Sequence, residues 1–508
     1  MQQTRYSTRH CSHLWLLAVL LPGCALSPEW RKHDKMCGPV SGQSRVESAP
    51  PPSMTVAPRL STTGRLGLQE CVDFAIEKNF SVRQSLAMAR ASQALVEAQK
   101  AEFDPQFYGT VRTDRSPDSG WNPANGSAGL LKKFTTGTEV DLEGGEVSSR
   151  TGDFRDDYIN GTTSNFAGTI RQPLLRGAGR SANLAGVKLS ELLRDQANAT
   201  VTAEILETLR AAETAYYAAA VAGMVEKSQR ESLDRAQMLL ADVKVRHKAG
   251  GASRIDILEA ETALSSAQER LVAAHKTAKD RIGDLWLVVG APLGDKLPEV
   301  TFAGLSERAL PAEDPKGSQS FARAMSTAPS AILLVNEVQR KEVELLRARN
   351  KALPRLDAEL SAASADDSAG GSDWEGVALL RVNIPWAMRA EKAQLAVAKA
   401  ELERSTAAQE QATERLKQRI YELCRGIDAG RAQLSAATQT ASASRQKWDE
   451  QMLRQKDGLV TVRDLRESEE ELQAAEVREQ QARLGLFAGW SALTQLDGTI
   501  VQRHGLSL

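Results

Sequence analysis

The sequence predicts a mainly α-helical protein with a small β part, in which very long antiparallel coiled-coil helices carry β-hairpins. Aromatic residues make up only 5% of the 508 residues. Ala, Glu, Gln, Arg and Leu dominate instead, which is typical of long helices and not of one thick core. The same order of helical, proline-bounded and β-forming segments also occurs twice along the chain, which indicates a structural duplication.

The N-terminal segment has the pattern of an exported chain. Basic residues precede an apolar run at 14–21, which has the length of a signal-peptide core and is too short to cross a bilayer as a helix. The stretch LPGC that ends at Cys24 resembles the lipobox of bacterial lipoproteins, which implies that Cys24 is acylated after cleavage. A plain secretory signal is the alternative, and both export the chain.

Charge and composition exclude several classes of function. The 64 basic and 65 acidic residues are interspersed, so no net field favours nucleic acid. Besides Cys24, the chain that follows the signal contains Cys37, Cys71 and Cys424 without regular spacing, and we expect no disulfide framework. The histidines are scattered, and no phosphate loop, nucleophile elbow or paired-carboxylate motif occurs. We therefore predict no metal site, no cofactor and no enzyme activity.

The two repeats align without a gap over their first helices. Asn79–Phe107 matches Ala328–Leu356, with a proline in each near the end. The expected units are a signal peptide (1–23), a polar, Pro-rich spacer (24–63), a first repeat (64–300), a linker (301–318), a second repeat (319–498) and a C-terminal tail (499–508).

After its first proline, each repeat enters short stretches of β-formers. These are PQFYGTVRT and NFAGTIRQP in the first repeat, and PRLDAELSA and GVALLRVNIP in the second, so each pair predicts a long hairpin. Alternation bounded by Trp374 and Trp386 is typical of a transmembrane barrel strand, although an ordinary soluble hairpin fits equally well. Junctions between strand and helix are expected at Pro105, Pro173, Pro354 and Pro385.

Proline-free runs predict two very long helices. Gly177–Lys248 and Ala387–Lys456 are each roughly 105 Å long if helical throughout. Returning helices at Ile255–Val289 and Arg463–Leu496 reach roughly 50 Å, so a shorter helix at Ser81–Phe103 has room to stack end to end with the first of them. Leucines spaced by seven indicate that the helices supercoil around one another.

Glycines mark where each long helix turns back. Gly250 and Gly458 each begin a Gly-x5-Asp motif, and glycine supplies the left-handed residue that commonly ends a helix. The charges around these turns either link neighbouring helices or simply cap helix ends. The candidate functional residues are Arg246, Lys248, Gly250, Arg254, Asp256, Lys456, Gly458, Arg463, Asp464 and Glu467.

This doubled unit resembles the TolC-like outer membrane efflux protein family from about Gly64 to Gly498. TIRQPLLRGAGRSAN at 169–183 and the two Gly-x5-Asp turns carry most of the likeness, while VNIPWAMRAEKAQ in the second repeat keeps Pro385 but lacks the glutamine. The resemblance implies a homotrimer in which each chain gives four strands to a common β-barrel in the outer membrane. The long helices would form an α-barrel through the periplasm.

The resemblance also implies a function. The chain would be a passive exit duct for tripartite efflux or type I export, lipid-anchored in the outer membrane through Cys24 and opened by an inner-membrane pump and a periplasmic adaptor. The glycine turns would form a periplasmic tip where polar links hold the tube shut and the adaptor docks. A lipid-anchored adaptor, or a coiled-coil scaffold without a pore, is the alternative.

The first repeat departs from the expected pattern. Pro105 and Pro173 lie 68 residues apart, whereas Pro354 and Pro385 lie 31 apart. The extra residues include FTTGTEVDLEGG, which has the character of a strand. Because a single unpaired strand would leave backbone groups unsatisfied in a barrel, we expect an additional hairpin in the outer loop.

Overall fold

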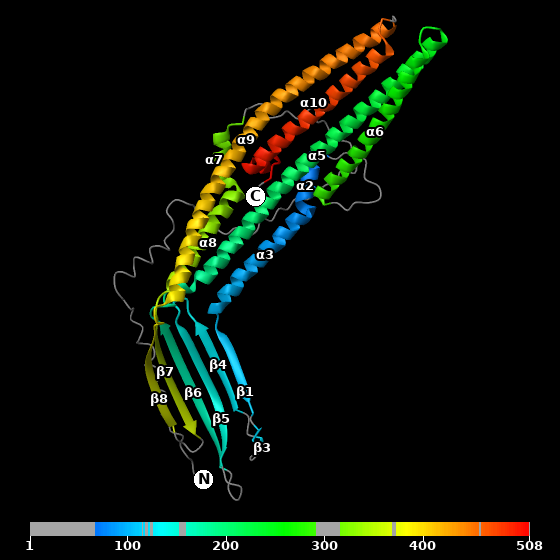
Figure 1. Cartoon of the computed structure of the whole chain (residues 1–508). Coiled ribbons are helices and arrows are strands. Elements are labelled where there is room, and N and C mark those ends of the chain that lie inside the picture. The colour runs from blue at the N-terminus through cyan, green and yellow to red at the C-terminus, as the bar shows by residue number, and fades with distance from the viewer. Residues whose placement is uncertain are drawn as a thin grey trace.

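The computed structural model shows a long, gently curved bundle of helices standing on one open sheet (Figure 1). This confirms the predicted class, with very long antiparallel helices and a small β part. Cys24 and the expected signal and spacer lie outside the described residues. The structure describes residues 67–113, 115–116, 120–121, 125–151, 159–290, 315–367, 372–456 and 459–506.

The helices have the predicted lengths and order. The two longest, α5 and α9, contain 64 and 68 residues, which corresponds to about 100 Å each. The first repeat contains α2 (Leu68–Lys78), α3 (Phe80–Lys100), the 3-10 turn η2 (Ala101–Phe103), α4 (Arg180–Asn183), α5 (Ala185–Lys248) and α6 (Arg254–Val289). The second contains α7 (Gly317–Thr327), α8 (Pro329–Lys351), α9 (Arg389–Lys456) and α10 (Val462–Leu496), followed by α11 (Thr499–Arg503).

Two shorter helices line each long one. Helices α3 and α6 both pack on α5, and α8 and α10 both pack on α9. The end-to-end stacking of α3 and α6 is fixed by Asn79, whose side-chain oxygen caps α3 at the Ser81 amide and whose Nδ2 donates to the Val288 carbonyl of α6 over 2.8 Å. The predicted stacking is therefore confirmed.

Helix α2 is an element that periodicity did not reveal. It buries Cys71, Val72 and Ala75 in the core cluster around α5. Burial, and to a lesser degree the charge of Glu70, raises the pKa of the Cys71 thiol to about 12. This thiol is therefore protonated at neutral pH and acts as a small apolar side chain.

The end of the chain is fastened to the middle of the bundle. Residues expected as a tail form α11, and the His504 Nε2 atom lies 2.8 Å from the buried carboxylate of Glu213 on α5. Ser491 also donates to Glu213, and Arg503 lies 3.8 Å away. Burial pushes the pKa of Glu213 upward, but His504, Arg503 and Ser491 outweigh burial and hold it below its ordinary value of 4.5.

Glu213→Gln should remove an acid-sensitive part of the stability. Because the folded-state pKa is lowered, the ionised carboxylate stabilises the fold above pH 4.5, and that contribution is lost as pH falls below this value. Gln keeps a hydrogen-bonding oxygen but no charge, so we expect a loss of about 1.5–3 kcal/mol at pH 7 and a smaller further loss on acidification. Thermal unfolding followed by circular dichroism from pH 7 to pH 3 measures both, with the exposed Glu403→Gln as the control. An acid response in Glu213→Gln equal to that of the control would contradict this assignment.

All strands of the main sheet are antiparallel, in the order β1-β4-β5-β6-β7-β8. Its edge strands are therefore β1 and β8. The strands are β1 (Gln106–Arg112), β4 (Asn125–Lys133), β5 (Glu139–Thr151), β6 (Ile159–Pro173), β7 (Arg355–Asp367) and β8 (Ser372–Asn383); β2 (Arg115–Ser116) and β3 (Gly120–Trp121) form a separate small ladder.

The extra residues of the first repeat form a hairpin, but not where we expected it. Strands β4 and β5 lie inside the main sheet, between β1 and β6, and their turn at 134–138 faces the helices. The expectation of four strands per chain, with the surplus in the outer loop, is therefore wrong. The physical reason is pairing, because β4 and β5 find ladder partners on both sides only within the sheet.

Candidate functional site

The first predicted turn is closed by backbone hydrogen bonds around a glycine. Gly250 has φ 84°, and the amide of Gly251 donates to the Arg246 carbonyl over 2.8 Å. A side chain at Gly250 would meet no atom within 4 Å, so the left-handed backbone alone requires glycine here. In the second turn, Lys456 is the last residue of α9, and Gly458 lies outside the described residues.

Asp256 and Asp464 cap the helices that leave the two turns. Asp256 accepts from the Ser253 amide over 2.7 Å, and its own amide donates to the Ser253 hydroxyl over 3.2 Å. Asp464 and Thr461 repeat this reciprocal capping box. The hydrogen bond from the Thr461 hydroxyl, and to a lesser degree the one from the Thr461 backbone amide, lowers the pKa of Asp464. The structure thus places both aspartates in caps.

Arg246 joins the two turns. Its Nη1 atom donates to the Gln455 carbonyl at the end of α9 over 2.5 Å, and its Nε atom pairs with Asp242 over 2.9 Å. The other charged candidates lie apart from this link. Lys248 and Arg254 are exposed, and Arg463 pairs along its own helix with Glu467 over 3.3 Å.

Sequence reasoning missed two glutamates that connect the helical hairpins. Glu469 on α10 accepts from Ser232 over 2.6 Å and from Arg235 over 3.2 Å, both on α5. Glu476, seven residues further along α10, accepts a hydrogen bond from the Ser228 hydroxyl of α5 over 2.5 Å. Both lie in a glutamate-rich helix where nothing local distinguishes them. These two glutamates contact α5 because of the way α10 is rotated about its own axis where it packs on α5.

The four junction prolines lie between strands and helices. Leu174 and Arg176, directly after β6, donate their amides to the carbonyls of Leu356 and Pro354 over 2.7 and 3.2 Å, so the junctions of the two repeats are joined. Pro105 precedes β1, Pro173 ends β6, Pro354 precedes β7 and Pro385 lies between β8 and α9.

The sheet has two chemically different faces. Residues directly opposite each other in an antiparallel ladder share a face, so the registers define a polar face and an apolar face. The polar face includes Tyr108, Ser127, Asp141, Thr169, Glu359 and Arg381; the apolar face includes Phe107, Leu130, Leu142, Ile170, Leu360 and Leu380. Leu131 and Leu379 are apolar residues on the polar face.

Hydrogen bonds lie on one face and exposed apolar side chains mostly on the other. Tyr108 donates to Asp141 over 3.0 Å, and Arg171 to Asp357 over 2.7 Å, both on the polar face. On the apolar face, Phe107 is 82% and Leu380 is 61% exposed. A face of this kind marks a surface that another apolar medium or molecule covers.

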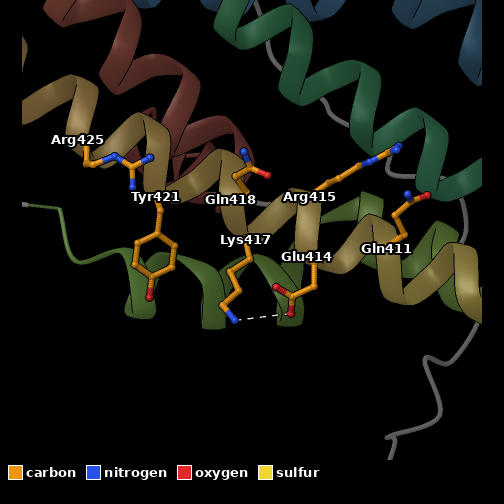
Figure 2. Close-up of a pocket in the computed structure, with 7 residues that line it drawn as sticks. All are labelled: Gln411, Glu414, Arg415, Lys417, Gln418, Tyr421 and Arg425. Atoms are coloured by element: carbon orange, nitrogen blue, oxygen red, sulfur yellow. Dashed lines mark ion pairs between the residues drawn. The ribbon is translucent and has the colours of Figure 1, made fainter.

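A shallow hollow on α9 does not have the features of a ligand site. Its volume is about 460 Å³, and Figure 2 shows its seven lining side chains on one helix, pointing in different directions. They carry both signs of charge, and Lys417 pairs with Glu414 over 3.6 Å. Within the ranges that the structure covers, no cluster of three His, Cys, Asp or Glu side chains fits a metal ion. Nor is any helix in those ranges long and apolar enough to cross a membrane.

Comparison with solved structures identifies the fold. No protein-family model matches the sequence, and no curated protein matches it. The Campylobacter jejuni CmeC outer membrane channel superposes with a TM-score of 0.65 at 12% identity, over 85% of each chain. Vibrio cholerae VceC, an outer membrane protein, gives 0.62 at 14% identity over 85% of this chain and 96% of its own. The open state of the Neisseria gonorrhoeae MtrE outer membrane channel gives 0.57 at 17% identity over 89% and 97%.

The chain has the TolC-like fold of outer membrane channels. The resemblance seen in the sequence is therefore confirmed for the fold. The superpositions cover at least 85% of this chain and of each of the three matched chains.

In this TolC-like fold, Ser253→Ala should loosen the start of α6. Losing the cap removes a partner of the first-turn amides, which typically costs about 1 kcal/mol. Hydrogen exchange of residues 254–258, followed by mass spectrometry, measures this loss. The control is Ser265→Ala, whose hydroxyl bonds only within α6 to the Glu261 carbonyl and should change exchange by less than about 0.5 kcal/mol. Equal exchange in the two variants would show that the cap does not hold this turn.

Proposed function

We propose that the chain is an outer membrane channel that serves as the passive exit duct of a tripartite efflux or type I export system. Three copies assemble, and a periplasmic adaptor and an inner-membrane pump open the duct and supply the energy. The observation that carries this proposal is a sheet with an apolar face, a polar face and two open edges, beneath helices about 100 Å long. The matched structures described as outer membrane channels support it.

The apolar face has the height of a membrane. Strand β8 contains 12 residues, and at about 3.4 Å per residue it is roughly 40 Å long. A barrel tilt of about 40° reduces that to roughly 30 Å, which is the thickness of the hydrocarbon core. Trp374, 75% exposed near the start of the strand, and Trp386, 99% exposed just beyond its end, would lie where aromatic girdles meet the lipid headgroups.

The edges of the sheet favour assembly with identical copies. An open edge in lipid leaves backbone N–H and C=O groups without partners, so spanning sheets are closed. Strand β1 runs away from the helices and β8 runs back toward them (Figure 1), so β8 of one copy can pair antiparallel with β1 of the next. A coiled-coil scaffold or an adaptor has no need of such a sheet.

The turns are proposed as the periplasmic tip and adaptor contact. Arg246, Lys248, Gly250, Arg254 and Asp256 surround the first turn. Lys456, Gly458, Arg463, Asp464 and Glu467 surround the second. Acylation of Cys24 would hold the N-terminus in the outer membrane lipid and is part of the proposal.

A charge on the apolar face should block membrane insertion, while the same change on the polar face should not. Leu380→Arg places a cation on the apolar face, three residues inside the helical end of β8, where the cost approaches but does not reach the about 2–4 kcal/mol of the bilayer midplane. Leu379→Arg, on the neighbouring residue, faces Glu359 across the ladder and should be tolerated. Outer membrane yield and unfolding in lipid vesicles compare the two. Equal behaviour of the variants would mean that the apolar face does not meet lipid.

Loosening the link between the turns should open the duct. Arg246→Ala removes a charge-assisted hydrogen bond, worth about 1.5–3 kcal/mol, so the equilibrium should shift toward the open state by roughly tenfold or more. Single-channel conductance in planar bilayers is the measurement. Arg230→Ala removes the same charge from an exposed position on α5, where the guanidinium pairs with Glu226 of the same helix, and should leave conductance unchanged. An Arg246→Ala trace like that of the control would contradict the gate.

A further inference from the structure

We propose that the membrane wall of this channel has eighteen strands, because each of three copies contributes the whole six-stranded sheet and not four strands of it. This inference rests on the proposed trimeric channel. The partner at each edge of the sheet is a second copy of this chain. The additional strands in each copy are β4 and β5.

Both outer sides of the β4–β5 hairpin are paired with neighbouring strands. Every residue of β1 pairs with β4, from Gln106 opposite Leu131 to Arg112 opposite Asn125. Every residue of β5 pairs with β6, from Glu139 opposite Arg171 to Thr151 opposite Ile159. Excluding the hairpin from the wall would break both ladders, and each freed backbone group that found no new partner would cost several kcal/mol in lipid.

A side-chain contact ties three of these strands together. The Tyr108 hydroxyl on β1 reaches across β4 to Asp141 on β5 over 3.0 Å. It crosses at Gly129, where a Cβ atom would overlap the Tyr108 ring. Glycine at this position therefore lets the ring lie over β4, and β1 is fastened to the inserted hairpin by more than its ladder.

The turn of the hairpin is built into the junction between sheet and helices. Gly137 is buried with φ 91°, and a side chain there would overlap the Gly177 carbonyl. The Gly179 amide donates to the Thr136 carbonyl over 3.0 Å, and Thr138 donates to Gln172 at the end of β6. The turn of the hairpin therefore packs against the residues that connect β6 to the helices, at the same level as the other strand ends.

The inserted strands continue both faces of the sheet. Leu130 and Leu142 lie on the apolar face beside Phe107 and Ile170, and Asp141 lies on the polar face. Because barrel diameter grows roughly linearly with strand number, eighteen strands give a wall about 1.5 times as wide as twelve. That number lies in the range where porin barrels enclose an aqueous channel.

Electron cryomicroscopy of the full chain in lipid nanodiscs tests the strand number directly. We expect six strands per copy, with residues 125–151 inside the wall. A ring with four strands per copy and these residues outside the wall would overturn the inference and leave the proposed channel intact. Absence of any ring would overturn the channel and the inference together.

A deletion provides the matched comparison. Replacing residues 113–158 with the connection 368–371, which joins β7 to β8, turns β1 and β6 into a simple hairpin without changing their directions. We expect the same number of copies and a wall about two-thirds as wide. Removing only 115–123 leaves 113, 114 and 124 to connect the paired residues Arg112 and Asn125, keeps β4 and β5, and should preserve the original width. An unchanged width in the larger deletion would contradict eighteen strands.

Discussion

The backbone hydrogen bonds that β1 and β8 cannot make within one chain are the constraint on which the rest of the structure depends. Within the described residues, each edge strand has a ladder partner on one side only, and in a membrane the lipid would offer no water to satisfy the other side. The helical columns follow the same lateral order, with α3 above β1 and α9 above β8 (Figure 1). Closing the sheet with further copies would therefore bring the edges of the helical bundle together as well, so one pairing would create both barrels.

Rigid joints carry that closure from the sheet to the distant turns. The junctions of the two repeats are bonded to each other through Leu174 and Leu356, and α3 is fixed end to end on α6 through Asn79. Near the far end, Glu469 connects α10 to α5. Movement at the turns is therefore transmitted through helices that are held together along their length. In the proposed duct, this arrangement allows one end to open while the wall stays closed.

Local chemistry made much of this predictable from the sequence. Gly250 and the prolines mark element ends through their own backbone preferences, so the ends of the long and returning helices were predicted within a few residues apart from the start of α5. Non-local pairing explains the failures. The strand character of 134–145 was visible, but its place between β1 and β6 depends on register with distant strands. Helix α2, and the link from Glu213 to His504, likewise depend on tertiary packing.

Photo-cross-linking from the edge strand tests whether neighbouring copies close the sheet. A photoreactive phenylalanine in place of Thr110 has its own β4 on one side, at Ser127, and in the proposed ring it would have the neighbouring copy on the other. In a mixture of isotopically light and heavy chains in outer membranes, closure between copies predicts cross-links from Thr110 to residues 372–383 of a different copy. Cross-links confined to the same chain, including its own β8, would contradict the account.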